Sequence, residues 1–426
     1  MNQDSTVTHL RQTALRRDLS ATAVVAGLVA ALVSFAGPFA VVVQATRAAG
    51  LDPAHTASWV FAITLGSGVS GLVLSWVTRL PVVVAWSTPG AALLIASLGG
   101  FAWSDAVGAF LTASVAACVL GATGWFGRLL SLVPGALMSA LLAGVLLPFV
   151  VHGATAVTAA PLAAAAVVVT FVLAKRWLER YAVLAALVAG ALVATLTGSL
   201  QPAALAGTGL HLTTPVWTWP TVDLRAQLGI AVPLLLVTMA AQNAPGLTVL
   251  RTAGYTPSDR LLVGAVSAVS AVLTPFGGHA TNLAAITAAI AAGPDAHPDP
   301  RRRYVAGLVC GAANLVAAAG AGWLVGAYSA LPAPVVAVLA AVALLPALAG
   351  ALGAALAEGP ATSTAALVTI AVTASGVVVL GVGSAFWALL VGVATWLVLR
   401  PARRAGSASP VRAAGPQERP RASSRA

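Results

Sequence analysis

The stretch that most constrains the fold of this chain is Ala271–Ala292, which has the length of a membrane span but does not read as one continuous helix. Its first third contains the helix breakers Pro275, Gly277 and Gly278. A clean helical run begins only at Leu283. Non-helical backbone at membrane depth survives only where protein buries it or where it lines a wet cavity. The pattern predicts a half-length helix that points its free N–H groups and positive dipole end into the protein, which favours an anion there.

A second interrupted span, Pro81–Ser97, lies near the front of the chain. Thr88 is suited to cap a helix, and Pro89 fits the first helical position. A helix of about ten residues from Pro89 rises roughly 15 Å, half of a hydrocarbon core of about 30 Å. Two interrupted spans in corresponding places indicate the binding site of a transporter.

The composition is that of a polytopic, all-α membrane protein. The chain is 59% hydrophobic and only 8% charged over its 426 residues, and its mean hydropathy is +0.95. Apolar runs of about 20 residues recur from end to end, whereas the short alternating segments of a membrane barrel are absent from the sequence. The net charge of +11 lies in short loops and tails, which indicates membrane orientation and no nucleic-acid partner.

The apolar runs predict about 14 transmembrane spans, of which the third and tenth are broken into a short strand plus a half-helix. With a cytoplasmic N-terminus, only Arg47 and Arg225 fall outside, so 20 of the 22 basic residues are cytoplasmic. The predicted location is the cell membrane, with both termini cytoplasmic. Residues 1–19 form an N-terminal tail, and the basic tail 401–426 is expected to be disordered against the anionic leaflet.

The chain also repeats itself. Gly124-Trp125, Pro134 and Leu146-Leu147-Pro148 recur 198 positions later as Gly322-Trp323, Pro332 and Leu344-Leu345-Pro346 (322 minus 124). The repeat divides the chain into seven spans over 20–200, an extracytoplasmic linker over 201–225, and seven spans over 226–400. Because seven is odd, the second repeat is inverted, and inverted repeats with broken spans are typical of secondary transporters.

Four segments carry a family resemblance: AWSTPGAAL (85–93), VTMAAQNAPGLTVLRTAGY (237–255), TPFGGHATNLAAITAAIAAGPDAHPDP (274–300) and VTASGVVVLGVGSAFWALLVG (372–392). Together they resemble the benzoate/proton symporter (BenE) family, over residues 20 to 400. The resemblance implies the fold shared by nucleobase permeases and sulfate-type carriers. In that fold spans 1–4 and 8–11 form a core and spans 5–7 and 12–14 a gate, with substrate between the facing ends of the third and tenth spans. The implied function is proton-coupled uptake of benzoate.

The candidate site residues lie beside the two breaks or in the middle of the eighth predicted span, residues 226–250. Their hydroxyl and amide groups can donate hydrogen bonds to a carboxylate; the alternative for each is a helix cap or a bond between helices. The aromatic residues can stack on a substrate ring or fill space behind the broken helices. The candidates are Ser87, Thr88, Gln242, Asn243, Thr281 and Asn282 for substrate binding, and Trp86 and Phe276 for stacking.

His279 is the candidate for proton coupling. It is the one His, Lys, Arg, Asp or Glu that the sequence places deep in a span, whereas acidic residues such as Glu179 map to span ends or loops. An imidazole gains and loses a proton near neutral pH, so a protonated His279 could neutralise a bound carboxylate. The alternative is a neutral imidazole hydrogen-bonded to a nearby carbonyl.

Other function classes fit the sequence less well. An enzyme needs paired carboxylates or His clusters inside the bilayer, and a channel needs a continuous polar lining; neither pattern is in the sequence. No cofactor and no metal are expected, since Cys118 and Cys310 lie singly in apolar helices. The alternative function is a nucleobase or other organic-anion/proton symporter on the same fold. The expected partners are benzoate or a similar aromatic carboxylate, protons and the lipid bilayer. A homodimer is a further alternative, because related folds often form dimers.

Overall fold

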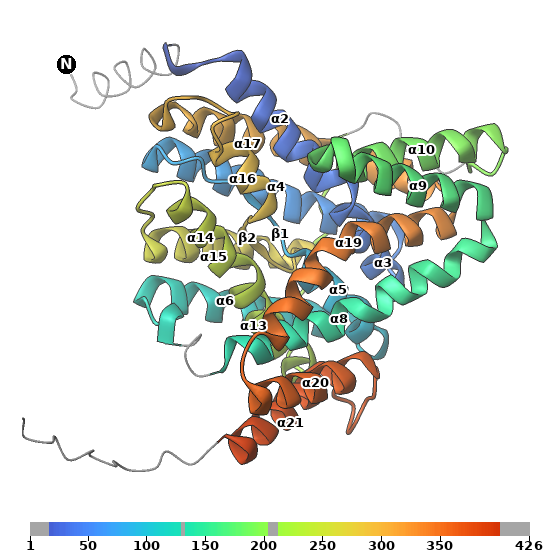
Figure 1. The fold of residues 1–426 in the computed structure, drawn as a ribbon, viewed down its shortest axis with the longest axis vertical. Helices are drawn as coiled ribbons and strands as arrows, with labels where there is room; N and C mark the ends of the chain where they lie inside the picture. The colour runs from blue at the N-terminus through green and yellow to red at the C-terminus, as the bar shows by residue number, and fades with distance from the viewer. Residues whose placement is uncertain (1–16, 129–132, 203–211, 401–426) are drawn as a thin grey trace, which may run out of the picture.

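The computed structural model describes residues 17–128, 133–202 and 212–400 (Figure 1). The predicted C-terminal tail 401–426 and residues 1–16 of the N-terminal tail lie outside this range, as does the middle of the linker, 203–211. The described part is mostly helical and contains a two-stranded sheet.

In the first half, apolar helices follow one another with short connections, and a strand interrupts the third predicted span. The elements are α2 (Ala21–Ala36), α3 (Pro38–Ala48), α4 (Pro53–Thr78), β1 (Val84–Trp86), α5 (Thr88–Ser97), η1 (Leu98–Gly100), α6 (Trp103–Thr123), α8 (Gly135–Ala156), η2 (Val157–Ala159), α9 (Pro161–Trp177), η3 (Glu179–Tyr181) and α10 (Ala182–Leu196).

In the second half, residues 224–252 form one helical rod with two π-turns, and a second strand interrupts the tenth predicted span. The elements are α12 (Leu224–Ala226), η4 (Gln227–Ala231), α13 (Val232–Thr238), η5 (Met239–Asn243), α14 (Ala244–Thr252), α15 (Asp259–Leu273), η6 (Thr274–Phe276), β2 (Thr281–Leu283), α16 (Ile286–Ala292), η7 (Pro300–Arg302), α17 (Tyr304–Ala319), α18 (Ala321–Ser329), α19 (Ala333–Leu356), α20 (Pro360–Ala374) and α21 (Ser384–Leu399).

Both half-helices start near the predicted breaks, with small shifts. The N-cap of α5 is Ser87, whose side chain accepts a hydrogen bond from the backbone N–H of Gly90; Thr88 is therefore the first helical residue and not the cap. The second half-helix begins at Ile286, three positions after the predicted Leu283, because Leu283 belongs to a strand. As predicted, a short strand precedes each half-helix: β1 comes before α5, and β2 comes before α16.

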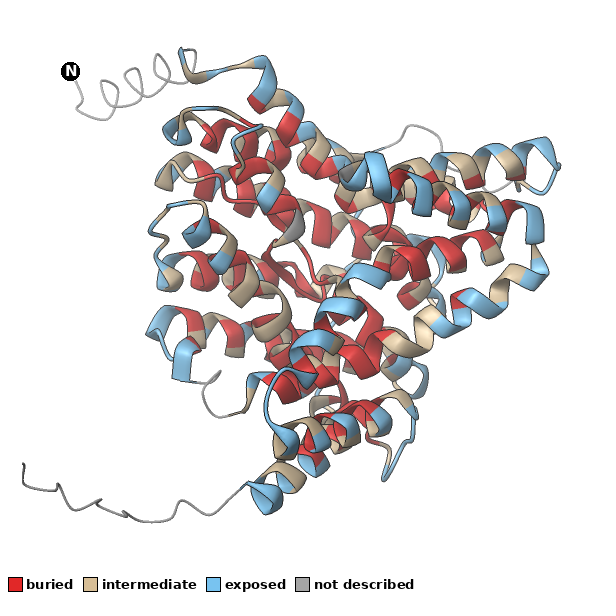
Figure 2. Ribbon diagram, viewed as in Figure 1, coloured by how far each residue is buried: buried red, intermediate tan, exposed pale blue. Residues whose placement is uncertain are grey.

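Strands β1 and β2 pair with each other in antiparallel fashion. Val84 lies opposite Leu283, Ala85 opposite Asn282, and Trp86 opposite Thr281. The sheet lies in the interior of the molecule, where Figure 2 shows most residues buried. Pairing satisfies the backbone groups that the interruption removes from the helical pattern.

The helices fall into two groups. The core group, residues 21–123 and 224–329, surrounds the sheet, with α4 packed on α17 and α6 packed on α15. The flanking group, residues 135–196 and 333–399, contains the pairs α8–α19, α9–α10 and α20–α21. In Figure 1 the flanking group lies along the right and lower edges of the molecule.

Within the described residues, seven helices are long and apolar enough to cross a membrane, or up to eight if the pair α17–α18, bent by 74°, is one span. Large apolar side chains such as Leu162, Val172 and Val316 are exposed on the outer helix faces, as expected of a surface in contact with lipid. The chain is an integral, multi-pass membrane protein.

The described part of the linker, residues 212–223, runs in extended form across the core group. The backbone N–H of Val216 donates to the hydroxyl of Ser58 on α4 (2.8 Å), and the N–H of Thr218 donates to the carbonyl of Pro275 (2.8 Å). The N–H of Thr221 donates to the carbonyl of Ser104 on α6 (3.1 Å). The linker therefore ties helices of both halves of the chain into one unit.

Gly246 on α14 sets how closely the eighth predicted span approaches β2. A Cβ at this position would lie 2.6 Å from the Cβ of Leu283 and 3.0 Å from the carbonyl oxygen of Ala284. We expect Gly246→Ala to lower the stability of the fold by about 1–3 kcal/mol through overpacking, seen as a lower midpoint of thermal unfolding in detergent. Gly353→Ala on α19 is the control, because no atom lies within 4 Å of the added Cβ. Equal midpoints for the two variants would contradict the close approach.

Candidate functional site

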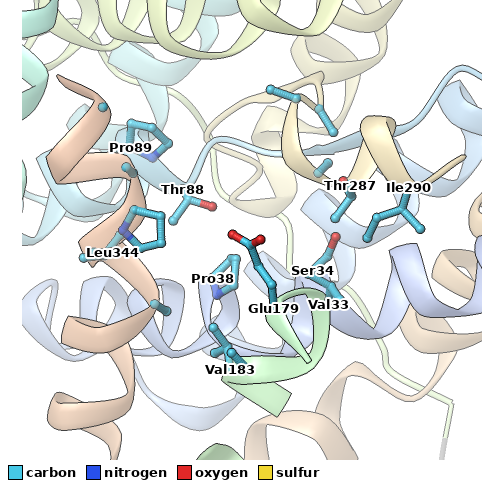
Figure 3. Close-up of a pocket in the computed structure, with 18 of the residues that line it drawn as sticks. Val33, Ser34, Pro38, Thr88, Pro89, Glu179, Val183, Thr287, Ile290 and Leu344 are labelled. Atoms are coloured by element: carbon cyan, nitrogen blue, oxygen red, sulfur yellow. The ribbon is translucent and has the colours of Figure 1, made fainter. Parts of the chain in front are cut away.

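A cavity of about 890 Å³ lies between the core group and the flanking group (Figure 3). The core group lines it with α2, β1, α5, η5 and α16, and the flanking group with α8, α9, α10 and α19. Several lining residues are exposed at the connection between α9 and α10, namely Trp177, Leu178 and Glu179, and we call this part of the cavity its mouth. On α19, the lining residues Pro346 and Gly350 are also exposed. A largely apolar cavity of this size with a few polar groups is typical of small-molecule sites.

The starts of the two half-helices border this cavity. Thr88 and Pro89 from α5 lie on one side of it, and Ala284, Ala285 and Thr287 from the β2–α16 segment on another. Figure 3 shows Thr88 and Thr287 on different elements around the same space. The breaks in the third and tenth predicted spans therefore meet at one place.

Of the predicted site residues, Trp86, Thr88 and Gln242 line the cavity. Trp86 packs edge-on against Phe35, with ring centroids 5.1 Å apart. Its indole N–H is buried and has no hydrogen-bond partner among the described residues. Gln242 belongs to the π-turn η5, and such turns often mark functional positions in helices.

Asn243, the next residue on the same turn, faces the strand instead. Its Oδ1 accepts a hydrogen bond from the backbone N–H of Leu283 (3.1 Å), and its side chain is buried. The two adjacent amides thus point to different surroundings: Gln242 to the cavity and Asn243 to β2.

Ser87, Thr281 and Asn282 are buried around the sheet and are not among the described residues that line the cavity. The hydroxyl of Ser87 caps α5, and the backbone N–H of Thr281 donates to the hydroxyl of Ser270 (3.2 Å). When the amide of Asn282 is oriented to satisfy both ends, its oxygen accepts the N–H of Ser87 (3.2 Å). The Asn282 side chain thus links the two broken spans, Ser87 caps α5, and Ser270 anchors β2 to α15.

His279 lies beside the sheet, fully buried, and its ring also stands outside the large cavity. The indole N–H of Trp59 donates to its Nδ1 (2.9 Å), and its Nε2 lies 3.0 Å from the carbonyl oxygen of Ser87. An indole N–H can only donate and a carbonyl can only accept, so this geometry holds the neutral ring with its proton on Nε2. A second proton could bind Nδ1 only after Trp59 moves.

Phe276 is not among the described residues that line the cavity. Its ring packs edge-on against Trp217 of the linker, with centroids 5.3 Å apart, and its carbonyl accepts a hydrogen bond from Ser58 (2.9 Å). The structure thus places it where the linker crosses the core group.

Sequence reasoning missed several polar residues of the cavity. Ser34 and Thr287 lie in apolar helices, where a single hydroxyl gives no signal. Lys175 and Glu179 lie at the end of α9 and in η3, which the sequence identifies as a loop; the structure folds that loop over the cavity. The hydrogen bond from Lys175 lowers the pKa of the Glu179 carboxyl below its ordinary value.

Comparison with known proteins gives one consistent family. A family model described as benzoate membrane transport protein (BenE) matches residues 17–398. The inner membrane protein YdcO of Escherichia coli (strain K12) is 36% identical over 374 residues, 88% of this chain and 95% of that protein. The benzoate membrane transport protein of Acinetobacter baylyi (strain ATCC 33305 / BD413 / ADP1) is 32% identical over 385 residues, 90% of this chain and 97% of that protein.

Among solved structures, the transmembrane domain of BicA, a bicarbonate transporter of a cyanobacterium, is similar in fold. The TM-score is 0.61 at 15% sequence identity, and the alignment covers 87% of this chain and 97% of that chain. At this identity the likeness shows a shared fold.

The different surroundings of the two amides lead to a stability prediction. Asn243→Ala leaves the buried N–H of Leu283 without its acceptor, so we expect a loss of about 1–3 kcal/mol in the stability of the fold. Gln242→Ala, on the cavity wall, is expected to change the thermal unfolding midpoint little. The two midpoints are compared in detergent without ligand. A larger drop in the unfolding midpoint for Gln242→Ala than for Asn243→Ala would contradict the placement of Gln242 on the cavity wall and of Asn243 against β2.

Proposed function

We propose that this chain, which belongs to the benzoate membrane transport protein (BenE) family, imports benzoate or a related aromatic carboxylate by proton symport. It is a membrane transporter and not an enzyme. The proposal rests most heavily on the cavity where the starts of α5 and α16 meet, because apolar walls there adjoin neutral hydrogen-bonding groups. An aromatic carboxylate needs both kinds of surface.

In the proposed binding mode the carboxylate accepts hydrogen bonds from the hydroxyl of Thr88 and the amide of Gln242. Both groups line the cavity, and Thr88 is the first residue of α5, whose positive dipole end favours the negative charge. The ring packs on Trp86 and on the apolar side chains of α8 and α19 that face it, Leu146 and Leu344. Asn243, Thr281, Asn282 and Ser87 act behind this surface by holding the sheet and the α5 cap.

We further propose that the chain has 14 spans in two inverted repeats, over residues 20–200 and 226–400. The described helices are numerous enough for 14 spans. They comprise the seven long apolar helices, the bent pair α17–α18, the shorter apolar helices α5, α10, α20 and α21, and the segments α9 and α16. The antiparallel pairing of β1 with β2 supports inversion, because equivalent strands of inverted repeats run in opposite directions.

The cavity mouth lies at the α9–α10 connection, beside the basic residues Lys175 and Arg176. The positive-inside rule assigns that end to the cytoplasm of the cell membrane and both termini to the same side. The structure then corresponds to an inward-open conformation. Alternating access requires the flanking group to move against the core group, whose sheet and linker hold it as one unit.

Proton symport removes the opposition of the membrane potential to anion entry. Benzoate is an anion, so a membrane potential negative inside opposes its entry by about 2.3 kcal/mol per 100 mV. Co-transport of one proton makes the loaded carrier neutral and lets a pH gradient drive accumulation. The test is uptake of radiolabelled benzoate into proteoliposomes with and without an inward proton gradient. Gradient-driven accumulation supports the proposal; uptake that ignores the gradient contradicts symport, and absence of uptake contradicts benzoate as substrate.

The binding mode predicts the effect of Gln242. Gln242→Ala removes a hydrogen bond to a charged carboxylate, which is worth about 1.5–3 kcal/mol, so we expect a loss of roughly 10- to 150-fold in benzoate affinity. Binding is measured on purified protein by scintillation proximity. The comparison is Asn282→Ala, whose side chain lies behind the cavity wall and which should change benzoate affinity less. If Gln242→Ala binds benzoate as the unaltered protein does, the Gln242 amide serves only helix packing.

We propose His279 as the group that couples the proton, which requires Trp59 to release Nδ1 during the transport cycle. His279→Gln should retain some benzoate binding but lose proton-driven accumulation in proteoliposomes. Trp59→Phe removes the N–H that occupies Nδ1 and should shift the pH dependence of uptake upward, since the ring accepts a proton more easily. A His279→Gln protein that still concentrates benzoate with unchanged pH dependence would make His279 a packing residue, with the proton carried by benzoate or by cavity water.

A further inference from the structure

The mouth of the cavity holds a pair of opposite charges. Among the described residues that line the cavity, Lys175 and Glu179 are the charged ones, and the Lys175 ammonium donates a hydrogen bond to Oε1 of Glu179. Both side chains are exposed, with exposed fractions of 42% for Lys175 and 73% for Glu179. Figure 3 shows the Glu179 carboxylate pointing into the cavity, in the space bordered by Thr88 and Ser34.

The Lys175–Glu179 pair provides the formal charges that an anionic substrate would meet along the described cavity lining. The remaining described lining is apolar or carries neutral hydroxyl, amide and ring groups, so the pair is the local source of formal charge along the path. A lone ammonium at the mouth would attract and retain a carboxylate, and a lone carboxylate would repel one. Paired, the two charges largely cancel at a distance, while the ammonium stays within reach of a passing carboxylate.

Glu179 and the substrate present the same chemical group to Lys175. We propose that Lys175 is a second, transient carboxylate station at the cavity mouth, and that Glu179 is its built-in competitor, which displaces the substrate carboxylate and keeps the station weak. This inference rests on the proposed function, because it takes the cargo to be an aromatic carboxylate. The pair lies on the flanking group, so the station moves relative to Thr88 and Gln242 when the two groups move.

Lys175 and Glu179 are close in the sequence as well as in space. Lys175 lies in the last turn of α9, where a cation is favoured by the helix dipole, and Glu179 follows four residues later in η3. The contact is therefore made within one connection and can open without unfolding either helix. An exposed pair of this kind contributes little to stability. Its substitution should leave the fold intact.

Three variants test the proposal: Glu179→Gln, Lys175→Gln and the double variant. Equilibrium binding of radiolabelled benzoate to detergent-purified protein is measured at low salt, with thermal unfolding as a check on folding. We expect Glu179→Gln to bind about 3-fold more tightly and Lys175→Gln about 3-fold more weakly, as one charge acting through water allows. The double variant, which is neutral again, should lie close to the unaltered protein.

Two further readouts separate this role from a structural one. Both single-variant shifts should shrink at about 0.5 M salt, where exposed charges are screened, and Glu179→Gln should release benzoate more slowly from preloaded proteoliposomes. Shifts of both singles in the same direction, or a double variant no closer to the unaltered protein, would overturn the proposal while leaving the transport function standing. Failure of the unaltered protein to bind benzoate would overturn both.

Discussion

Two spans that break at membrane depth leave backbone N–H and C=O groups that lipid cannot satisfy, and the pairing of β1 with β2 supplies their partners. Each strand has three residues, so neither would be stable alone in the bilayer. The pairing fixes where α5 and α16 start, and with that the position of Thr88, Pro89 and Thr287 around the cavity. The rest of the core group serves to bury this small sheet.

A layer of buried polar side chains supports the sheet. Asn243 reaches it from α12–α14 through Leu283, Ser270 from α15 through Thr281, and Trp59 from α4 through His279 and the carbonyl of Ser87. Each of these bonds is buried, where an unmatched group costs about 1–3 kcal/mol. The layer therefore anchors the sheet to α4, to α15 and to the helix of residues 224–252.

Much of the architecture follows from the sequence, because Pro and Gly interrupt two apolar spans in places that lipid would not allow. These interruptions predicted the two broken spans, which the structure contains. The membrane class was predicted from composition and the family from four sequence segments, and both agree with the apolar helices and the relatives. The register of the sheet was beyond prediction, since it depends on contacts between residues about 200 positions apart. For the same reason the sequence could not tell that Gln242 faces the cavity while Asn243 faces β2.

Glu179 shows a different limit. The sequence places Glu179 in a connection between two spans, and the structure agrees. However, this connection folds over the cavity and places the Glu179 carboxylate in the cavity lining. Local pattern gives the identity of an element but not what lies beneath it.

In the proposed binding mode the substrate lies where the two half-helices begin. A structure with 4-iodobenzoate bound tests it most directly, because iodine is located independently of the protein density. We expect the iodine inside the cavity lined by Trp86, Thr88 and Gln242, with the carboxylate next to the start of α5. Iodine on the far side of the sheet, near Phe276 and the linker, or only on the lipid-facing surface, would contradict it.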